Sequence, residues 1–315
     1  MNEIYERVGE GVIAIDTELV RPRMDASHLI VDRGRAAFVD AGTHFSVPNL
    51  LAALAAQGLD VDAVDYVLLT HIHLDHAGGA GRLAAALPRA KVLVHPRGAP
   101  HIIDPSMLIA AAKAVYGEAR FVREYGDIVS IPARRIETPD DGHRIRVGGR
   151  TLELIHTPGH AMHHLCIVDR DTAEVFTGDT FGLSYREFDT AAGEFIFPTT
   201  SPTQFDPQQL HASIDRILDY KPSSAYLTHY SRVGRVDELG VDLHADIDAF
   251  VNIARSVADA PDRTLRMQPM LFDHLSARLA AHGYAGDAAQ RHAILDDDVA
   301  LNAAGLHSWL ARRST

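Results

Sequence analysis

Short runs of β-branched and aromatic residues alternate with longer stretches rich in alanine and leucine along the first 95 residues. The short runs have the length and composition of strands, which predicts strands at residues 12–16, 28–31, 36–40, 66–70 and 91–95. The longer stretches predict helices at residues 47–57 and 77–87, the second ended by Pro88. This alternation is typical of an α/β fold.

The strand pattern returns after a helical interruption. Residues 96–131 contain the apolar run MLIAAAKAVY, which predicts helices that cross the sheet edge and offer one wall for a pocket. Strand patterns follow in RIRV, TLELIH, HLCIVD and AEVFTGD, then a loop at 181–204, a helix at 207–220 and the strand SAYLTH. Two successive sheet-forming halves predict a layered α/β/β/α domain over residues 1–235.

The β signal disappears after that domain. Apolar residues recur at helical spacing on three faces, which include Val251 and Ala254, Leu271 and Leu275, and Leu306 and Leu310. We therefore expect an all-helical C-terminal extension over residues 236–315. Because a tail of this length has little core of its own, it is expected to pack on the α/β domain or across a homodimer.

Composition and charge narrow the class of protein. The 315 residues are 46% hydrophobic and 23% charged, which is typical of a soluble globular chain. The net charge of −12 and the lack of a run of lysines and arginines argue against nucleic acid or an anionic membrane as partner. Cys166 is the only cysteine, so the chain forms no internal disulfide. With a charged N-terminus and no membrane-length apolar run, we expect a cytoplasmic protein.

Histidine is unusually frequent, at 19 of 315 residues, and four metal-ligand types converge in one run. In the extended stretch after a predicted strand, His71, His73 and Asp75 share one side, and His76 follows at the head of a helix. Histidine is the commonest protein metal ligand. The pattern therefore predicts a metal site at the end of this strand.

The run HIHLDH resembles the HxHxDH signature of the metallo-β-lactamase fold superfamily, and the resemblance covers residues 10–235. Later and earlier positions match as well, with HTPGH, FTGD and YLTHY downstream and FVDAG upstream. The resemblance implies a four-layer αββα sandwich followed here by the helical extension. It also implies two metal ions per chain, with seven ligands: His71, His73 and His160 on one ion, Asp75, His76 and His229 on the other, and Asp179 between them. Asp40 matches the acid that orients the metal-binding loop.

The ligand set determines the chemistry. Imidazoles and carboxylates without thiolate suit Zn²⁺, our first expectation, and also Fe or Mn. Two divalent ions lower the pKa of a bridging water toward neutrality, so that hydroxide attacks a carbonyl or phosphoryl centre. Asp75 and Asp179 are the expected catalytic carboxylates, and Asp75 or a metal-bound water supplies the proton to the leaving group.

Comparison among branches of the resembling superfamily favours a hydrolase of small acyl compounds. Flavodiiron oxidoreductases carry Glu where this chain has His73, and quorum-signal lactonases carry Tyr where it has Gly182. Glyoxalase II-like thioesterases share a helical extension, although no basic cluster for glutathione is visible here. We therefore expect an ester, thioester or lactone of a small, partly apolar molecule as substrate. The alternatives are a di-iron redox or oxygen-handling protein and a non-catalytic metal-bound sensor.

The loop after the expected bridging carboxylate is rich in aromatic residues. Phe181, Tyr185 and Phe197, together with Met107 and Tyr116 from the earlier helical segment, are predicted to wall a substrate pocket beside the metals. The alternative is that half of the aromatic residues in this loop belong to the ordinary core.

Overall fold

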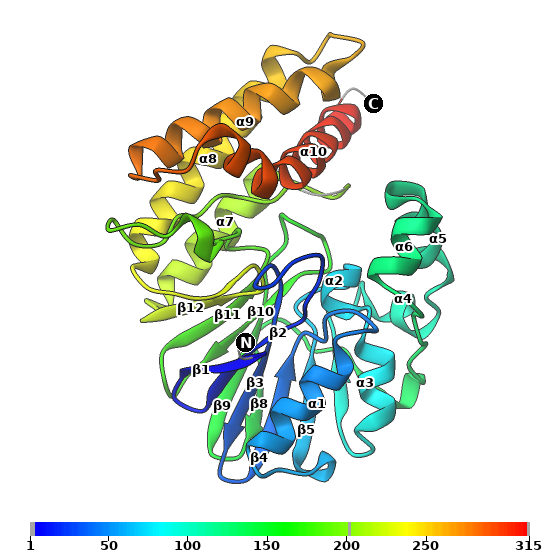
Figure 1. Ribbon diagram of the computed structural model, residues 1–315. Coiled ribbons are helices and arrows are strands. Elements are labelled where there is room, and N and C mark those ends of the chain that lie inside the picture. The colour runs from blue at the N-terminus through cyan, green and yellow to red at the C-terminus, as the bar shows by residue number, and fades with distance from the viewer. Residues whose placement is uncertain (1–3, 201–202, 314–315) are drawn as a thin grey trace. The chain divides into compact units, whose positions relative to one another are not determined.

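The computed structural model describes residues 4–200 and 203–313, which contain two β-sheets (Figure 1). The first sheet has seven strands in sequence order: β1 (Tyr5–Gly9), β2 (Val12–Asp16), β3 (Ala26–Asp32), β4 (Arg35–Val39), β5 (Val64–Leu68), β6 (Lys91–Leu93) and β7 (Ile136–Glu137). The first four are antiparallel, whereas β4 to β7 are parallel. Helical crossovers between the parallel strands make this pairing possible.

The second sheet has six strands in the order β13-β12-β11-β10-β9-β8. Their bounds are β8 (His143–Val147), β9 (Arg150–His156), β10 (Leu165–Asp169), β11 (Glu174–Gly178), β12 (Ser224–Leu227) and β13 (Ser231–Val233). The two sheets pack through a shared apolar core that includes Val12, Ile30, Val39 and Leu68 from the first and Leu152, Leu154, Ile167 and Phe176 from the second. Removing such side chains from water stabilises the fold by roughly 1.5–3 kcal/mol each.

Helices cover the other face of the first sheet. Its apolar side chains share a core with α1 (Val47–Ala56) and α3 (Ala80–Ala86), which lie beside β4 and β5 in Figure 1. The short α2 (Leu74–Ala77) precedes α3, and α4 (Ala99–Ile103), α5 (Ser106–Tyr116) and α6 (Glu118–Glu124) follow β6. Within the described residues, 3₁₀ turns occur at Val61–Ala63, Ala133–Arg135 and Arg186–Phe188.

The helix expected at residues 77–87 is in fact two helices, α2 and α3, interrupted at Gly78 and Gly79. A Cβ on Gly79 would lie 2.4 Å from the carbonyl oxygen of Thr43 and 2.5 Å from that of Ala41. The Gly79 amide donates to the Gly42 carbonyl at 2.8 Å. The break therefore lets two backbone segments approach more closely than a side chain would allow.

Contacts divide the described residues into two compact units. Unit 1 contains the described residues up to His156, with His163–Gly178 and Ser223–Arg232, and so carries both sheets and α1 to α6. Unit 2 contains Thr157–Met162 and the described residues of Asp179–Pro222 and Val233–Thr315. Its helices are α7 (Pro207–Asp219), α8 (Val236–Ser256), α9 (Arg263–Ala281) and α10 (Ala288–Arg313).

The two sheets, their flanking helices and the C-terminal helices confirm the expected fold class. Strands β1, β7 and β13 were absent from the expectation because they are short or mix charged with apolar positions. Among the described helices, none combines the length and apolarity needed to span a bilayer. The division into residues 1–235 and 236–315 stays a prediction about folding units.

Within unit 2, the C-terminal helices pack on the loop that follows β11. The Tyr185 hydroxyl donates to Asp298 at 3.3 Å, and Asn302 Oδ1 accepts from the Thr200 amide at 2.6 Å. Arg278 on α9 donates to the Ile196 carbonyl at 3.0 Å and pairs with the buried Asp246 of α8. These contacts make the last three helices part of the core around the loop.

Ending the chain after Arg235 is therefore expected to give insoluble or aggregated protein, because the aromatic loop would lose the helices that bury it. Soluble yield and size-exclusion chromatography measure this outcome. A chain ended after Arg313, which keeps all four helices of unit 2, is the control. A soluble and fully active protein ending at Arg235 would contradict the prediction and show that residues 1–235 fold independently.

Candidate metal centre

The loop after β5 alternates buried apolar residues with ligand-type residues. Ile72 and Leu74 are 2% and 5% exposed, and each belongs to an apolar cluster of unit 1. With Ile72 anchored, the alternation turns His71 and His73 to the other side of the chain, whereas Asp75 lies in the first turn of α2. Ile72 therefore fixes the direction in which these two histidines point.

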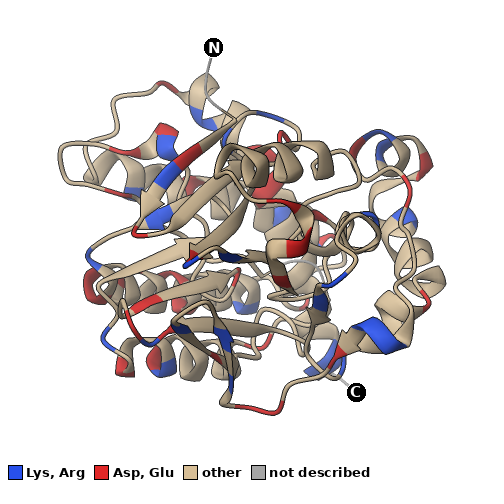
Figure 2. Ribbon diagram, turned by 90° about the horizontal axis from the view of Figure 1, so that it is seen from below, with Lys and Arg blue, Asp and Glu red and all other residues tan. Residues whose placement is uncertain are grey.

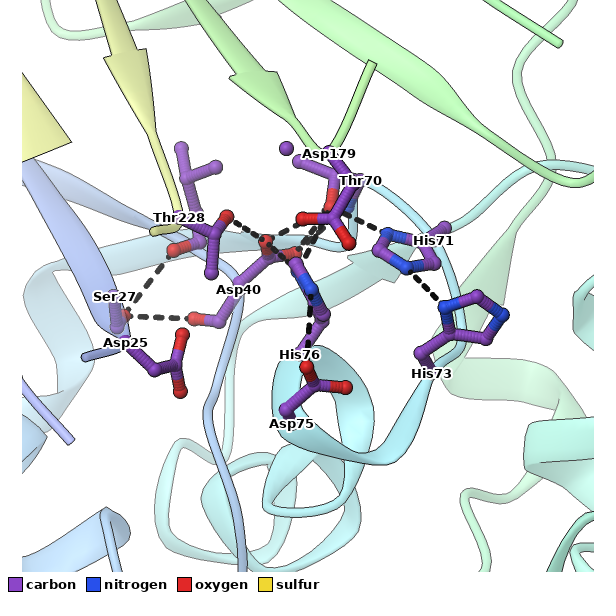
Figure 3. A network of polar contacts seen from close by, with 12 residues as sticks. Asp25, Ser27, Asp40, Thr70, His71, His73, Asp75, His76, Asp179 and Thr228 are labelled. Atoms are coloured by element: carbon purple, nitrogen blue, oxygen red, sulfur yellow. Dashed lines mark hydrogen bonds and ion pairs between the residues drawn. The ribbon is translucent and has the colours of Figure 1, made fainter. Parts of the chain in front are cut away.

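Asp40 organises this loop from the neighbouring strand end (Figure 3). Its buried carboxylate accepts from the Thr70 amide at 2.8 Å, the Thr70 hydroxyl at 2.8 Å and the Thr228 hydroxyl at 3.1 Å. His76 Nδ1 lies 2.8 Å from the same carboxylate. Because a carboxylate only accepts, Nδ1 of His76 carries the proton and Nε2 has the lone pair needed for a metal.

Asp75, His76 and His229 form the first candidate metal group, all within unit 1. Their ligand atoms lie within 4.8 Å of one another. Asp75 Oδ2 is 3.6 Å from His76 Nε2 and 3.5 Å from His229 Nε2. His229 Nδ1 donates to the Met24 carbonyl at 2.9 Å, which directs its Nε2 toward Asp75. Both histidines are thus held in the tautomer that binds metal through Nε2.

His71 and His73 form a second pair of ligand-type nitrogens in unit 1. His71 Nε2 is 2.8 Å from His73 Nδ1, and His71 Nδ1 is 3.2 Å from the Thr70 hydroxyl. The His164 ring stacks on His71 with ring centroids 4.9 Å apart. This packing holds the His71 ring on the side opposite the apolar cluster.

His160 and Asp179 belong to unit 2, where His160 Nε2 lies 3.4 Å from Asp179 Oδ2. His160 Nδ1 donates to the Thr199 carbonyl at 3.2 Å, which again presents Nε2 as the ligand nitrogen. Asp179 directly follows Gly178, the last residue of β11 in unit 1. A Cβ on Gly178 would lie 2.7 Å from the Thr70 hydroxyl, so the strand that leads into Asp179 ends beside the loop that carries His71.

The donor chemistry fits borderline divalent ions. His71, His76, His160 and His229 each have one ring nitrogen beside a hydroxyl, carboxylate or carbonyl, and Asp75 and Asp179 add oxygens. Metal-ligating histidines in proteins are held in this way. The assignment of all seven residues to two ions stays a prediction, as does the identity of the metal.

Asp25 is a further buried carboxyl in unit 1 that no sequence motif indicated (Figure 3). Its Oδ2 accepts from the Thr17 hydroxyl at 2.7 Å. Burial raises the pKa of Asp25 to about 7, although the charges of His229 and His76 act in the opposite direction.

The three aromatic residues expected to line a pocket are completely buried. Phe181, Tyr185 and Phe197 are each 0% exposed, and the Tyr185 and Phe197 rings meet edge to face at 5.9 Å. The structure places them in the core of unit 2, and their role in binding substrate stays a prediction. Met107 is 72% exposed, whereas Tyr116 packs against the apolar cluster that contains Leu74.

Comparison with known proteins gives a family and several relatives. A family model described as the metallo-beta-lactamase superfamily matches residues 20–229. The Metallo-beta-lactamase fold-containing protein ST1585 of Sulfurisphaera tokodaii is 27% identical over 212 residues, which are 66% of this chain and 73% of that protein. A hydroxyacylglutathione hydrolase of Aeromonas hydrophila is 30% identical over 189 residues, 60% of this chain, which spans only 54% of that enzyme.

A solved structure extends the likeness to the C-terminal part. The metallo-beta-lactamase family protein TTHA1429 from Thermus thermophilus is similar with a TM-score of 0.68 at 20% identity. The similarity covers 96% of this chain and 94% of that one. The fold, including a C-terminal part beyond the matched family region, therefore occurs in another solved protein.

Proposed function

Because this chain belongs to the metallo-beta-lactamase superfamily, we propose that it is a dinuclear metal-dependent hydrolase of an ester, thioester or lactone of a small, partly apolar acyl compound. One observation carries the proposal. His76 and His229 are both fixed through Nδ1, by Asp40 and by the Met24 carbonyl, and both turn Nε2 toward Asp75. The two histidines already have this orientation in the protein, so binding an ion requires little rearrangement of their side chains.

In the proposal, His71, His73 and His160 would hold one ion, Asp75, His76 and His229 would hold the other, and Asp179 would help to hold both. Bound divalent ions of this kind supply a nucleophilic hydroxide near pH 7 and polarise the carbonyl of the substrate. We take Zn²⁺ as the ion, with Fe or Mn as alternatives. The relative named hydroxyacylglutathione hydrolase supports a hydrolytic reaction on an acyl compound.

The protein's own residues then have separate tasks. Asp40 keeps His76 and Thr70 in place through its hydrogen bonds, so the loop does not reorganise during the reaction. Asp75 lies beside both Nε2 atoms of its group, which supports our proposal that it passes a proton to the leaving group.

A small-molecule substrate, the absence of a nucleic-acid partner, a cytoplasmic location and a homodimer remain parts of the proposal. Figure 2 shows Lys and Arg interspersed with Asp and Glu along the ribbon. The net charge of −12 also gives a phosphate backbone little electrostatic attraction. This supports a small substrate over a nucleic acid.

Activity against a panel of esters, thioesters, lactones and phosphodiesters tests the function. We expect hydrolysis of medium-length acyl thioesters, lactones or aryl esters, with kcat/KM rising roughly fourfold per added methylene, because each buried methylene contributes about 0.8 kcal/mol. His71→Ala protein gives the background rate. A flat dependence on chain length, or a preference for phosphodiesters, would contradict the acyl-hydrolase assignment.

Metal analysis of the same preparation distinguishes the alternatives. A hydrolase with zinc is expected to show turnover without a visible absorption band. Iron near two equivalents, with a visible band and no turnover on the panel, would instead favour the di-iron redox or sensor function.

A further inference from the structure

Helices α7 and α8 of unit 2 pack together and carry the same short pattern. His211 and Asp215 are four residues apart on α7, and His244 and Asp248 are four residues apart on α8. Side chains at this spacing lie on one face of a helix, one turn apart. The two faces meet, so two histidines and two carboxylates from different parts of the sequence form one cluster.

The two rings meet through their nitrogen edges. His211 Nδ1 lies 2.6 Å from His244 Nδ1, the ring planes are within 9° of parallel, and the centroids are 4.9 Å apart. Since the nitrogens are much closer than the centroids, the rings do not stack face to face. Two lone pairs cannot face each other at this distance, so a proton lies between the nitrogens.

Each outer ring nitrogen has a carboxylate from the opposite helix. His211 Nε2 is 3.3 Å from Asp248 Oδ1, and His244 Nε2 is 3.1 Å from Asp215 Oδ1. A carboxylate on one ring nitrogen fixes the tautomer and makes the other nitrogen a stronger ligand, as in metal-binding histidines. The carboxylates make both Nδ1 atoms stronger ligands in this way, and the two Nδ1 atoms face each other.

We propose that His211 and His244 form an additional metal site, which binds a divalent transition ion such as Zn²⁺ or Ni²⁺ in place of the shared proton. Imidazole nitrogen suits these ions, and Zn–N bonds of about 2.0–2.1 Å in a tetrahedral site put two ligand nitrogens roughly 3.3 Å apart. The nitrogens therefore have to separate by less than about 1 Å. Both side chains are about one quarter exposed, 26% and 27%, which leaves room for this rotation.

The charges at the cluster favour a cation. Asp215 and Asp248 contribute two negative charges, and their side chains are 68% and 73% exposed, so water has access to complete the coordination. Because the ligands come from two helices, a bound ion would tie α7 to α8. Since an ion that binds only the folded protein stabilises it, the Tm should rise with the concentration of the ion.

The test is the metal content of the full chain without a histidine tag, dialysed against a fixed concentration of Zn²⁺. We expect the His211→Ala and His244→Ala proteins to hold one equivalent less than the unsubstituted protein. Because the result is the difference in metal content between the unsubstituted protein and each variant, ions bound equally by other residues cancel. In parallel, Ni²⁺ should raise the Tm of the unsubstituted protein by more than it raises the Tm of the two variants.

His292→Ala is the matched control. His292 on α10 also precedes an aspartate by four residues, with Nδ1 2.7 Å from Asp296 Oδ1, but its ring stacks on Phe272 at 3.8 Å instead of facing a histidine. This variant should keep the extra equivalent and the Ni²⁺ shift in Tm. Equal metal content in unsubstituted, His211→Ala and His244→Ala proteins, or the same loss in His292→Ala, would overturn the proposal.

Discussion

His71→Ala and Asp179→Ala proteins are expected to lose at least one metal ion from the candidate centre and to lose turnover by roughly 10³-fold or more. The His71 change would remove a ligand whose ring is already held by Thr70 and His164. The Asp179 change would remove the carboxylate proposed to be shared by both ions. With either change, a shared nucleophile and an open coordination position are lost together, so the effect on rate should be much larger than the effect on folding.

The ions are best counted by elemental analysis in a His211→Ala/His244→Ala background, which reports on the candidate centre alone. Two ions per chain are expected in reconstituted protein of this background. His143→Ala, at an exposed position of β8, is the control and should keep both ions and full activity. One ion or fewer in the background protein, or full metal content after the His71 change, would contradict the dinuclear assignment.

The sequence predicted most of the sheet strands and the ligand loop because both depend on local alternation. Residues 12–16 were expected as a strand and form β2. The helix expected at residues 47–57 is α1, which ends one residue earlier, at Ala56. His71 and His73 flank the buried Ile72, as the alternation predicts, whereas Asp75, expected on the same side, lies in helix α2. Local spacing was sufficient for these positions because the side-chain pattern that determines them lies within a few residues of the chain.

Features that depend on distant partners could not be predicted from spacing. Asp25 has no motif, and its pKa near 7 results from its complete burial, which depends on the fold and not on local spacing. The hydrogen bond from Tyr185 to Asp298 on α10 joins residues 113 positions apart, and no local pattern indicates it. Similarly, His211 and His244 are unremarkable in sequence and become a pair only because α7 packs on α8.

Replacing Asp40 by Asn should weaken binding of the ion at His76 by roughly 10- to 100-fold while changing the shape of the side chain very little. The two Asp40 oxygens have different surroundings. Oδ1 accepts from the Thr70 amide, whereas Oδ2 accepts from the Thr228 hydroxyl and from His76 Nδ1. The asparagine NH₂ cannot face the Thr70 amide, because both are donors, so it must occupy the position of Oδ2.

In that orientation the NH₂ group faces His76 Nδ1 and forces it to accept. The His76 proton then moves to Nε2, the nitrogen that turns toward Asp75, and His76 can no longer bind metal without losing this hydrogen bond. The change of tautomer is visible in ¹⁵N NMR of the metal-free protein, and a titration against a competing chelator measures the affinity. We also expect a loss of about 1–3 kcal/mol in the free energy of unfolding, since the buried hydrogen bonds to Asp40 lose their ionised acceptor.

Asp169→Asn separates the effect on metal from the effect on stability. Asp169 is another buried aspartate of unit 1, and its carboxylate accepts from Arg150 at 2.7 Å. Its replacement should destabilise the protein by a similar amount, because Arg150 would lose its ionised partner, but should leave the metal affinity and the His76 tautomer unchanged. If Asp40→Asn and Asp169→Asn proteins bound metal equally well, Asp40 would be a residue that stabilises the fold and has no part in preparing His76 as a ligand.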